Sequence, residues 1–150
     1  MTDALKVPPD MLIERITEIF KKDERIKVPD WTKYLKAGVH REKKWETTDW
    51  FYRRLASTLR KISVYGPIGV SRLSSEYGGR VDAGSKRYHP GNGSRFIIRH
   101  TIKTLEELGY VKTEKRGRSL TPQGTSLVEK TSKELMKSIS EKTPALQKYL

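Results

Sequence analysis

The residues with the clearest chemical potential are basic side chains arranged in two rows along the segment DWFYRRLASTLRKISV. At about 100° per residue of helix, Arg53 and Arg60 stack in one row, and Arg54 and Lys61 stack in a neighbouring row. Trp50 projects between the two rows. Arginine binds phosphate through paired hydrogen bonds, and tryptophan can stack on an unpaired base. The pattern therefore indicates a surface that binds nucleic acid.

The opposite side of this segment carries an apolar stripe. Phe51, Leu55, Leu59 and Ile62 fall within a sector of about 80°, which predicts an amphipathic helix at about 49–64. Such a helix would bury its stripe in a core and present its basic rows to a partner.

Structural alternatives stay open for both features. A tryptophan at a helix start often wedges against a neighbouring element, and the basic rows could form a solvated face with no partner. Asp49 is the only acidic residue in the segment, which favours a polyanionic partner. We expect that replacing Arg54 and Arg60 with glutamate leaves the fold intact and weakens RNA binding.

A second cationic segment is YGGRVDAGSKRYHPGNGS at 77–94, rich in glycine and proline. Its composition predicts a loop, with a loose hairpin as a possible form. Arg80, Lys86 and Arg87 supply charge, and glycines let the backbone approach phosphates closely. The stretch GRVDAGSK at 79–86 resembles a phosphate-binding P-loop. We reject that interpretation, because serine precedes lysine and no buried strand leads into the stretch. A disordered surface loop is the alternative.

A third row, Arg95, Arg99 and Lys103, lies on a helix predicted from Ser94 to Leu108. This is the position of the recognition helix in a winged helix. More charge follows in the predicted wing, on Lys112, Lys115, Arg116 and Arg118. Ordinary solubilising charge is the alternative, because glutamates intervene. The full set of candidate RNA-binding residues is Trp50, Arg53, Arg54, Arg60, Lys61, Arg72, Arg80, Lys86, Arg87, Arg95 and Arg99.

The overall charge supports this interpretation. The 150 residues include 31 Lys and Arg against 18 Asp and Glu, giving a net charge of +13. Residues 51–100 hold 10 basic residues but only 2 acidic ones, Glu76 and Asp82. Solvated surfaces normally mix the two signs. We therefore expect a polyanionic partner for the middle third, although a basic, heat-adapted protein without such a partner would share the composition.

Helix and turn signals along the chain predict one domain over residues 1–150. A first helix opens at Pro8, Pro9 and Asp10, and a short helix is expected from Asp30 to Leu35. A further short helix is expected at about 70–76. A strand pair is expected within 110–120, and a capped helix from 121 onward. Pro144 is expected to end the last helix, with a frayed tail after about residue 140. The order predicts a mainly α fold: a helical bundle around a central amphipathic helix, with a winged-helix-like core and a small β-hairpin wing.

Several other classes of function lack support. The chain has no cysteine, and its three histidines are scattered, so we expect no metal site and no cofactor. No carboxylate pair, metalloprotease motif or serine elbow stands out, so we do not expect an enzyme. No apolar run approaches a membrane span and no signal peptide is visible, so we expect a cytoplasmic protein with no membrane partner.

Six segments resemble, in order, the small-subunit ribosomal protein S nineteen-e family of archaea and eukaryotes. They are VPPDMLIERI, KVPDW, KAGVHREK, DWFYRRLASTLRKI, YGPIGVSRLSSEYGGR and LEELGYVKTEKRGRSLTPQG. The resemblance covers about residues 5–130, and it implies binding of ribosomal RNA in the head of the small subunit and a part in subunit maturation. It implies RNA-facing roles for Trp50, Arg54 and Arg60. It also implies contacts with other small-subunit proteins and assembly factors.

Two other functions remain as competing hypotheses. A winged-helix regulator would read duplex DNA through the 95–108 helix and act as a dimer, but the densest positive segment precedes that helix. A protein-interaction scaffold would use the apolar side of residues 122–140, which could equally pack on its own domain. We expect the chain to be a monomer when it is not bound to RNA.

Overall fold

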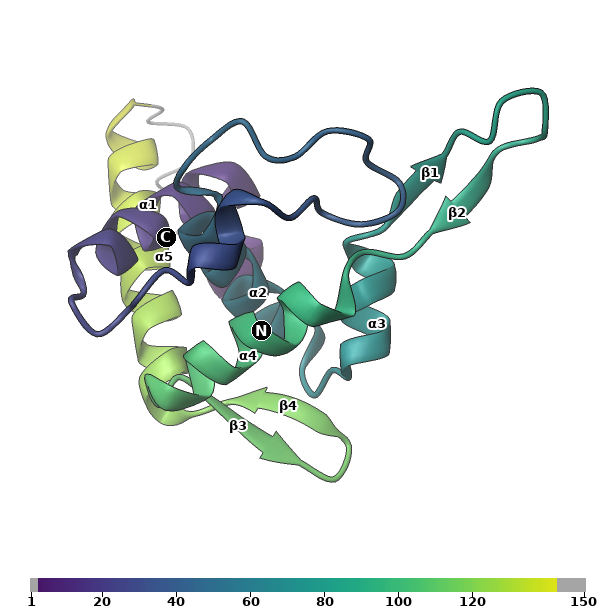
Figure 1. The fold of residues 1–150 in the computed structure, drawn as a ribbon. Coiled ribbons are helices and arrows are strands. Elements are labelled where there is room, and N and C mark those ends of the chain that lie inside the picture. Colours follow the sequence, from purple (N-terminus) through teal and green to yellow (C-terminus); the bar gives the residue numbers. More distant parts are fainter. Residues whose placement is uncertain (1–2, 143–150) are drawn as a thin grey trace.

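The computed structural model describes residues 3–142 and has the predicted mainly α architecture (Figure 1). Within residues 3–142, two short 3-10 helices, five α-helices and two strand pairs follow one another. The first half contains η1 (Asp3–Leu5), α1 (Pro9–Lys22), η2 (Asp30–Lys33), α2 (Trp50–Tyr65) and α3 (Val70–Glu76). The second half contains β1 (Gly79–Val81), β2 (His89–Gly91), α4 (Arg95–Glu107), β3 (Val111–Glu114), β4 (Gly117–Leu120) and α5 (Pro122–Lys142).

The predicted amphipathic helix, α2, lies at the centre of the core. Its apolar stripe is buried as expected: Phe51, Leu55 and Leu59 are fully buried and Ile62 is 1% exposed. The helix contacts α1, α4 and α5 through these and neighbouring residues.

The second half of the chain forms the winged-helix-like core. β3 and β4 pair antiparallel, with Val111 opposite Leu120. The backbone of Ile68, between α2 and α3, joins this wing by exchanging two hydrogen bonds with Arg118, at N···O distances of 3.1 and 2.9 Å. At Gly117, with φ of 141°, a Cβ atom would lie 2.8 Å from the Ile68 backbone, so only glycine fits this contact without displacement.

The segment predicted as a loop contains a short hairpin that projects from the helical body (Figure 1). Gly79 pairs with Gly91 and Val81 pairs with His89. The imidazole of His40 lies against this glycine pair, since a Cβ on Gly79 would come within 2.8 Å of it. The glycines therefore serve a close packing contact as well as a turn.

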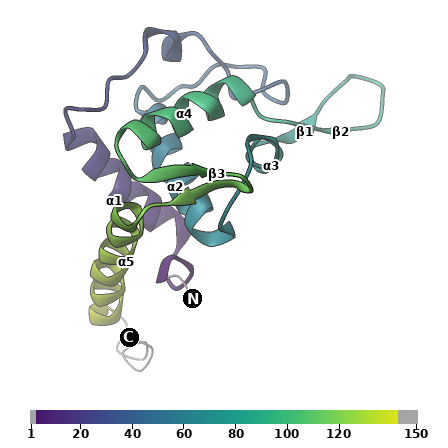
Figure 2. The same ribbon diagram turned by 90° about the horizontal axis from the view of Figure 1, so that it is seen from below.

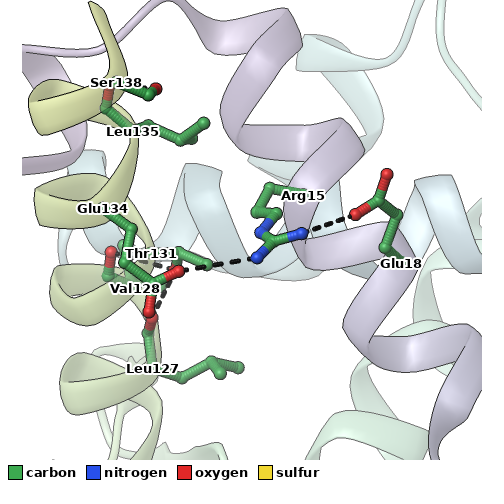
Figure 3. A network of polar contacts seen from close by, with 8 residues as sticks. All are labelled: Arg15, Glu18, Leu127, Val128, Thr131, Glu134, Leu135 and Ser138. Atoms are coloured by element: carbon green, nitrogen blue, oxygen red, sulfur yellow. Dashed lines mark hydrogen bonds and ion pairs between the residues drawn. The ribbon is translucent and has the colours of Figure 1, made fainter. Parts of the chain in front are cut away.

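The last helix, α5, packs along α1 and extends away from the body, on the side opposite the β1–β2 hairpin (Figure 2). Arg15 of α1 bonds to Glu18 at 2.9 Å and reaches Glu134 of α5 at 3.8 Å (Figure 3). These groups are exposed, so the pair adds little stability, and the apolar contacts of residues such as Val128 hold α5 in place.

The short helix and the tail differ from, or lie beyond, what the sequence predicted. The short helix expected from Asp30 to Leu35 is a 3-10 helix that begins after Pro29 and ends at Lys33, with Tyr34 as its C-cap residue. Pro144 and the tail lie outside the described residues, which reach Lys142 in α5. Within residues 3–142, none of the helices has the length and apolar character needed to cross a bilayer.

Candidate nucleic-acid interface

Trp50 is buried, which contradicts the expectation that its ring stacks on an RNA base. Its ring is only 4% exposed, and its indole N–H donates to the carbonyl oxygen of Thr32 at 3.1 Å. It stacks on Trp45 with ring centroids 4.7 Å apart and planes 5° apart. The structural alternative is therefore correct: Trp50 packs the 30–33 turn and the segment around Trp45 against the start of α2.

Two of the four basic residues in the predicted rows form ion pairs inside the molecule. Arg53 bonds to Glu14 of α1 at 3.0 Å, and Lys61 bonds to Glu76 of α3 at 3.0 Å. The Lys61 ammonium holds the pKa of the Glu76 carboxyl below its usual value. Both side chains stay reachable from solvent, but each would have to share its charge with a carboxylate. Their predicted role in RNA binding is thus weakened.

Arg54 lies among aromatic rings at the end of α3. Its guanidinium carbon is 3.8 Å from the centroid of Tyr77 and 5.2 Å from that of Trp45. Burial lowers its pKa below the usual value, and no carboxylate among residues 3–142 pairs with it. A glutamate at position 54 would lose this stacking and face the electron-rich rings, so the structure leads us to expect that Arg54→Glu destabilises the fold as well as changing the charge.

Arg60 is turned away from Arg54, at roughly 120° around the helix axis. It is half-buried, and its Nε has no hydrogen-bond partner among the described residues. The two basic rows of α2 therefore point to different flanks, so they do not form one continuous surface by themselves. Arg72 on α3 is exposed, with its guanidinium 5.6 Å from the ring centroid of Tyr65.

The β1–β2 hairpin presents its cations to solvent. Arg80 lies over the ring of Tyr88 at 3.7 Å from the centroid, which fixes the guanidinium on one face of the hairpin. Lys86 and Arg87 are exposed near the hairpin tip. Within residues 3–142 none of these three side chains forms an ion pair.

The first turns of α4 continue this basic surface. Arg95 and Arg99 are exposed and have no ion-pair partner in the described part of the chain. Six residues of α3, the hairpin and α4 thus share two properties, exposure and the absence of a described carboxylate partner. We call them the open basic surface: Arg72, Arg80, Lys86, Arg87, Arg95 and Arg99. α3 and the hairpin lie on one side of the molecule in both views, and α4 begins beside the hairpin before crossing the body (Figures 1 and 2).

The structure argues against the rival hypothesis that α4 reads duplex DNA. Trp31 of η2 packs on one flank of α4, with its ring centroid 5.1 Å from Phe96 and 5.1 Å from His100. The hairpin also replaces the short turn that precedes a recognition helix, and Ser94 N–H is bonded to the carbonyl oxygen of Ala37. Trp31 and the hairpin therefore lie beside the first turns of α4, where a recognition helix would need room for the walls of a major groove.

A cationic loop that sequence reasoning left out lies beside the hairpin. The sequence analysis assigned no element or site to residues 39–47, yet Arg41, Lys43 and Lys44 line a cleft of about 770 Å³, to which Glu42 and Glu46 also contribute. Arg54 and Arg80 line the same cleft, which runs between this loop and the base of the hairpin. The signal was present in the sequence as the run HREKKW, in which basic residues adjoin a tryptophan.

His40 connects this loop to the hairpin. Burial, and then the charges of Arg41 and Arg54, lower its pKa below the ordinary value. Its side chain packs beside Gly79 and Gly91. The contact holds the loop and the hairpin together, so their cations border a common cleft.

Comparison with known proteins agrees with this geometry. The model of a family described as ribosomal protein S19e matches residues 3–138. The chain belongs to the ribosomal protein S19e family. It is 49% identical over 150 residues to small ribosomal subunit protein eS19 of Thermoplasma acidophilum, and 47% identical over 150 residues to that of Thermoplasma volcanium, with both chains covered completely in each case. The protein of the same name from Haloarcula marismortui is 41% identical over 155 residues, covering 99% of each chain.

Membership of the S19e family confirms the resemblance seen in the six sequence segments. This is a family of ribosomal proteins, and the relatives compared above are named as proteins of the small ribosomal subunit. The family match also spans every element that carries the open basic surface, from α3 to the start of α4.

Proposed function

We propose that this protein binds ribosomal RNA in the head of the small subunit through the open basic surface and the cleft beside it. It acts as a structural component with no catalytic role. The relatives at 49% and 47% identity are named as small-subunit proteins, which supports placing this chain there. The protein is a monomer before it binds and acts in the cytoplasm.

One observation carries the proposal. The six cations of the open basic surface have no carboxylate partner among residues 3–142, whereas ion pairs occupy Arg53, Lys61, and Arg15 and Lys21 of α1. Lys130 and Lys133 of α5 are also unpaired in this part of the chain, but they adjoin Glu129 and Glu134 in the sequence. A surface that leaves its cations unpaired at one end of the molecule attracts a polyanion. Folded RNA fits better than regular duplex DNA, because the surface is a projecting hairpin and an irregular cleft.

The mechanism is charge neutralisation combined with a fit of shape. Guanidinium groups at Arg80, Arg87 and Arg95 each can bind a phosphate through two hydrogen bonds. Each such contact should steepen the dependence of log affinity on log salt concentration by roughly 0.7–0.9. The hairpin extends the reach of these groups beyond the helical body, so RNA segments on two sides of it can be held at once.

A filter-binding experiment with a transcript of the small-subunit head tests the proposal. We expect Arg80→Glu with Arg87→Glu to weaken binding by at least about tenfold and to make the salt dependence shallower. The matched control is Lys130→Glu with Lys133→Glu on α5, which makes the same change of charge at exposed positions away from the hairpin. The control should bind within about twofold of the unaltered protein. Equal losses in both variants would show that only net charge matters and would contradict the proposal.

Binding at this surface also accounts for a role in subunit maturation. A protein that clamps separate RNA segments stabilises their folded arrangement by binding it and not the unfolded form. The opposite end of the molecule, built by α1 and α5, stays available for other small-subunit proteins and for assembly factors (Figure 2).

A further inference from the structure

The hairpin that projects from the helical body (Figure 1) carries a stacked pair of side chains, Arg80 and Tyr88. Arg80 of β1 is paired with Pro90, and Tyr88 stands two residues before Pro90, so both side chains leave the same face of the hairpin. Diagonal neighbours on one face can contact each other when their side chains are long or aromatic. The guanidinium carbon of Arg80 lies 3.7 Å from the centroid of the Tyr88 ring, so the guanidinium covers one face of that ring.

The second face of the Tyr88 ring is open to solvent. Tyr88 is 51% exposed even though the guanidinium covers its first face. In the described part of the chain no other ring packs against it, and its hydroxyl forms no hydrogen bond with a side chain. Arg80 and Tyr88 also line a hollow of about 490 Å³ together with Ser75 and Asn92. The surface beside the pair therefore has room for a ligand.

A second stacked pair in the molecule, Arg54 and Tyr77, shows how such a pair looks when it serves the fold. Arg54 lies 3.8 Å from the centroid of the Tyr77 ring, and the ammonium of Lys61 lies 4.9 Å from the same centroid. The Tyr77 hydroxyl donates to Ser57 at 2.9 Å, and the ring packs against the core. The ring and the hydroxyl of Tyr77 are thus both used within the molecule, whereas Tyr88 keeps a ring face and a hydroxyl for a ligand.

The charges around Tyr88 indicate what kind of ligand fits. Lys86 and Arg87 directly precede it, are exposed, and form no ion pair within residues 3–142. The single acidic residue in the hairpin sequence, Asp82, accepts a hydrogen bond from the backbone N–H of Gly84 at 3.0 Å. An open aromatic face with cations beside it matches a ligand that combines a flat ring with negative charge, as a nucleotide of RNA does.

Arg80 prepares the tyrosine ring for such a ligand. An exposed side chain moves between rotamers, and a ligand that fixes one rotamer loses affinity through the entropy cost. The guanidinium that lies over Tyr88 restricts the ring before any ligand arrives. Stacking on the open face therefore costs less side-chain entropy than stacking on an isolated surface tyrosine.

We propose that Tyr88 stacks on one unpaired base of RNA with its open ring face, so that the base, the tyrosine and the Arg80 guanidinium form three layers. The phosphates next to that base lie within reach of Lys86 and Arg87. The inference rests on the proposed function, because the base belongs to the RNA that the open basic surface holds. It adds a contact with a base, which phosphate binding alone does not make, and it requires single-stranded RNA at the hairpin.

NMR titration of the full-length protein with two short RNAs tests the inference. One is hexaadenylate, and the other is a chain of six abasic riboses with the same number of phosphates. We expect the unaltered protein to bind hexaadenylate at least about fivefold more tightly, because only that RNA can stack. Tyr88→Leu should remove this preference, and Tyr88→Phe should keep it, since phenylalanine retains the ring face.

The matched control is Tyr34→Leu, which removes another exposed tyrosine. Tyr34 is 78% exposed, and within residues 3–142 no cation lies over its ring. This variant should keep the preference for hexaadenylate within about twofold. The inference is overturned if the abasic chain binds as tightly as hexaadenylate, if Tyr88→Leu keeps the preference, or if Tyr34→Leu loses it to the same extent.

Filter binding to the head transcript separates this inference from the proposed function. Tyr88→Leu should weaken binding of the transcript by at least about fivefold and leave its salt dependence unchanged, because the variant removes a stacking surface and no charge. Arg80→Glu with Arg87→Glu should instead make the salt dependence shallower.

The two variants give different outcomes for the two claims. If the charge variant loses transcript binding while Tyr88→Leu binds as the unaltered protein does, the proposed function stands and the base contact is overturned. If the charge variant binds the transcript normally, the proposed function fails, and the comparison of hexaadenylate with the abasic chain alone decides whether Tyr88 stacks on a base.

Discussion

At the scale of single residues, the position of Arg54 shows that a cation on a basic helix can serve the fold as well as a ligand. Its guanidinium lies over Tyr77, and the hydroxyl of Tyr77 donates to Ser57 at 2.9 Å. Arg54, Tyr77 and Trp45 thereby join α2 to the end of α3 and to the 43–47 segment. The edges of the guanidinium still border the cleft, so one residue links stability and binding.

Replacement of Arg54 with alanine should lower the free energy of unfolding by about 1–3 kcal/mol, because two aromatic contacts of a partly buried cation are lost. Arg54→Lys should recover only part of this, since an ammonium group cannot stack as a plane. Urea unfolding measures both. The exposed Arg87→Ala serves as the control and should stay within about 0.5 kcal/mol of the unaltered protein. A similarly small effect for Arg54→Ala would mean that the stack contributes nothing to stability.

His40 should make stability depend on pH in mildly acidic solution. Its folded-state pKa lies below the ordinary value of 6.5, so the folded protein binds fewer protons than the unfolded chain. Stability is therefore complete above about pH 6.5 and declines as the pH falls toward the lowered pKa, by at most about 1.4 kcal/mol per pH unit. His40→Asn should flatten this decline between pH 6.5 and 5, measured by thermal unfolding. The control, His89→Asn at an exposed position, should keep it. An unchanged slope in His40→Asn would contradict this account.

The residue-level errors of the sequence analysis have a common physical cause. A helical wheel gives the direction in which a side chain leaves its helix, and for α2 it placed the buried stripe correctly. It does not show which distant segment covers the opposite side. Glu14 pairs with Arg53 across 39 positions, and Thr32 covers Trp50 across 18. Contacts of this kind are set by tertiary packing.

At the scale of elements, the hairpin depends on close backbone approaches that only glycine allows. An ideal Cβ on Gly78 would lie 2.3 Å from the carbonyl oxygen of Gly91, well inside contact distance. The turn signals in 77–94 predicted an irregular loop and left undecided whether it contains a hairpin. They could not specify the pairing of Gly79 with Gly91, because a glycine-rich strand has no side-chain pattern that fixes its register.

Gly78→Ala should displace the base of the hairpin and lower the free energy of unfolding by about 1–3 kcal/mol. It should also weaken binding of the head transcript, because the hairpin cations move relative to the cleft. Gly69→Ala is the control: nothing lies within 4 Å of its ideal Cβ. Urea unfolding and filter binding should show the control within about 0.5 kcal/mol of the unaltered protein. If Gly78→Ala matches the control in both assays, the hairpin base is not the rigid support inferred here.

The wing and its flanking helices were the elements best predicted from sequence. Gly109 ends α4 with φ of 79°, and the hydroxyl of Thr121 accepts from the N–H of Gly124 at the start of α5. These signals are local, since caps and glycine stops act within a few residues. These elements could be predicted from the sequence for that reason. Only the folded structure shows that the 39–47 loop lies beside the hairpin.

At the scale of the whole molecule, the basic excess of the middle third of the sequence lies toward one end of the fold. The excess of basic residues in 51–100 predicted a binding face in the middle third of the chain. In the fold, α3, the hairpin and the start of α4 come from that third and lie at one end, and α5 extends from the other (Figure 2). A molecule arranged in this way should bind RNA with one end and leave the other for protein neighbours.

Reconstitution of small subunits that lack this protein tests the central claim most directly. Sedimentation at moderate salt would compare the unaltered protein, Arg80→Glu with Arg87→Glu, and the α5 control Lys130→Glu with Lys133→Glu. We predict that the unaltered protein and the control sediment with the subunit, while the hairpin variant stays at the top of the gradient as a folded monomer. Sedimentation of the hairpin variant with the subunit in the same yield as the control would contradict the claim that the open basic surface holds the RNA.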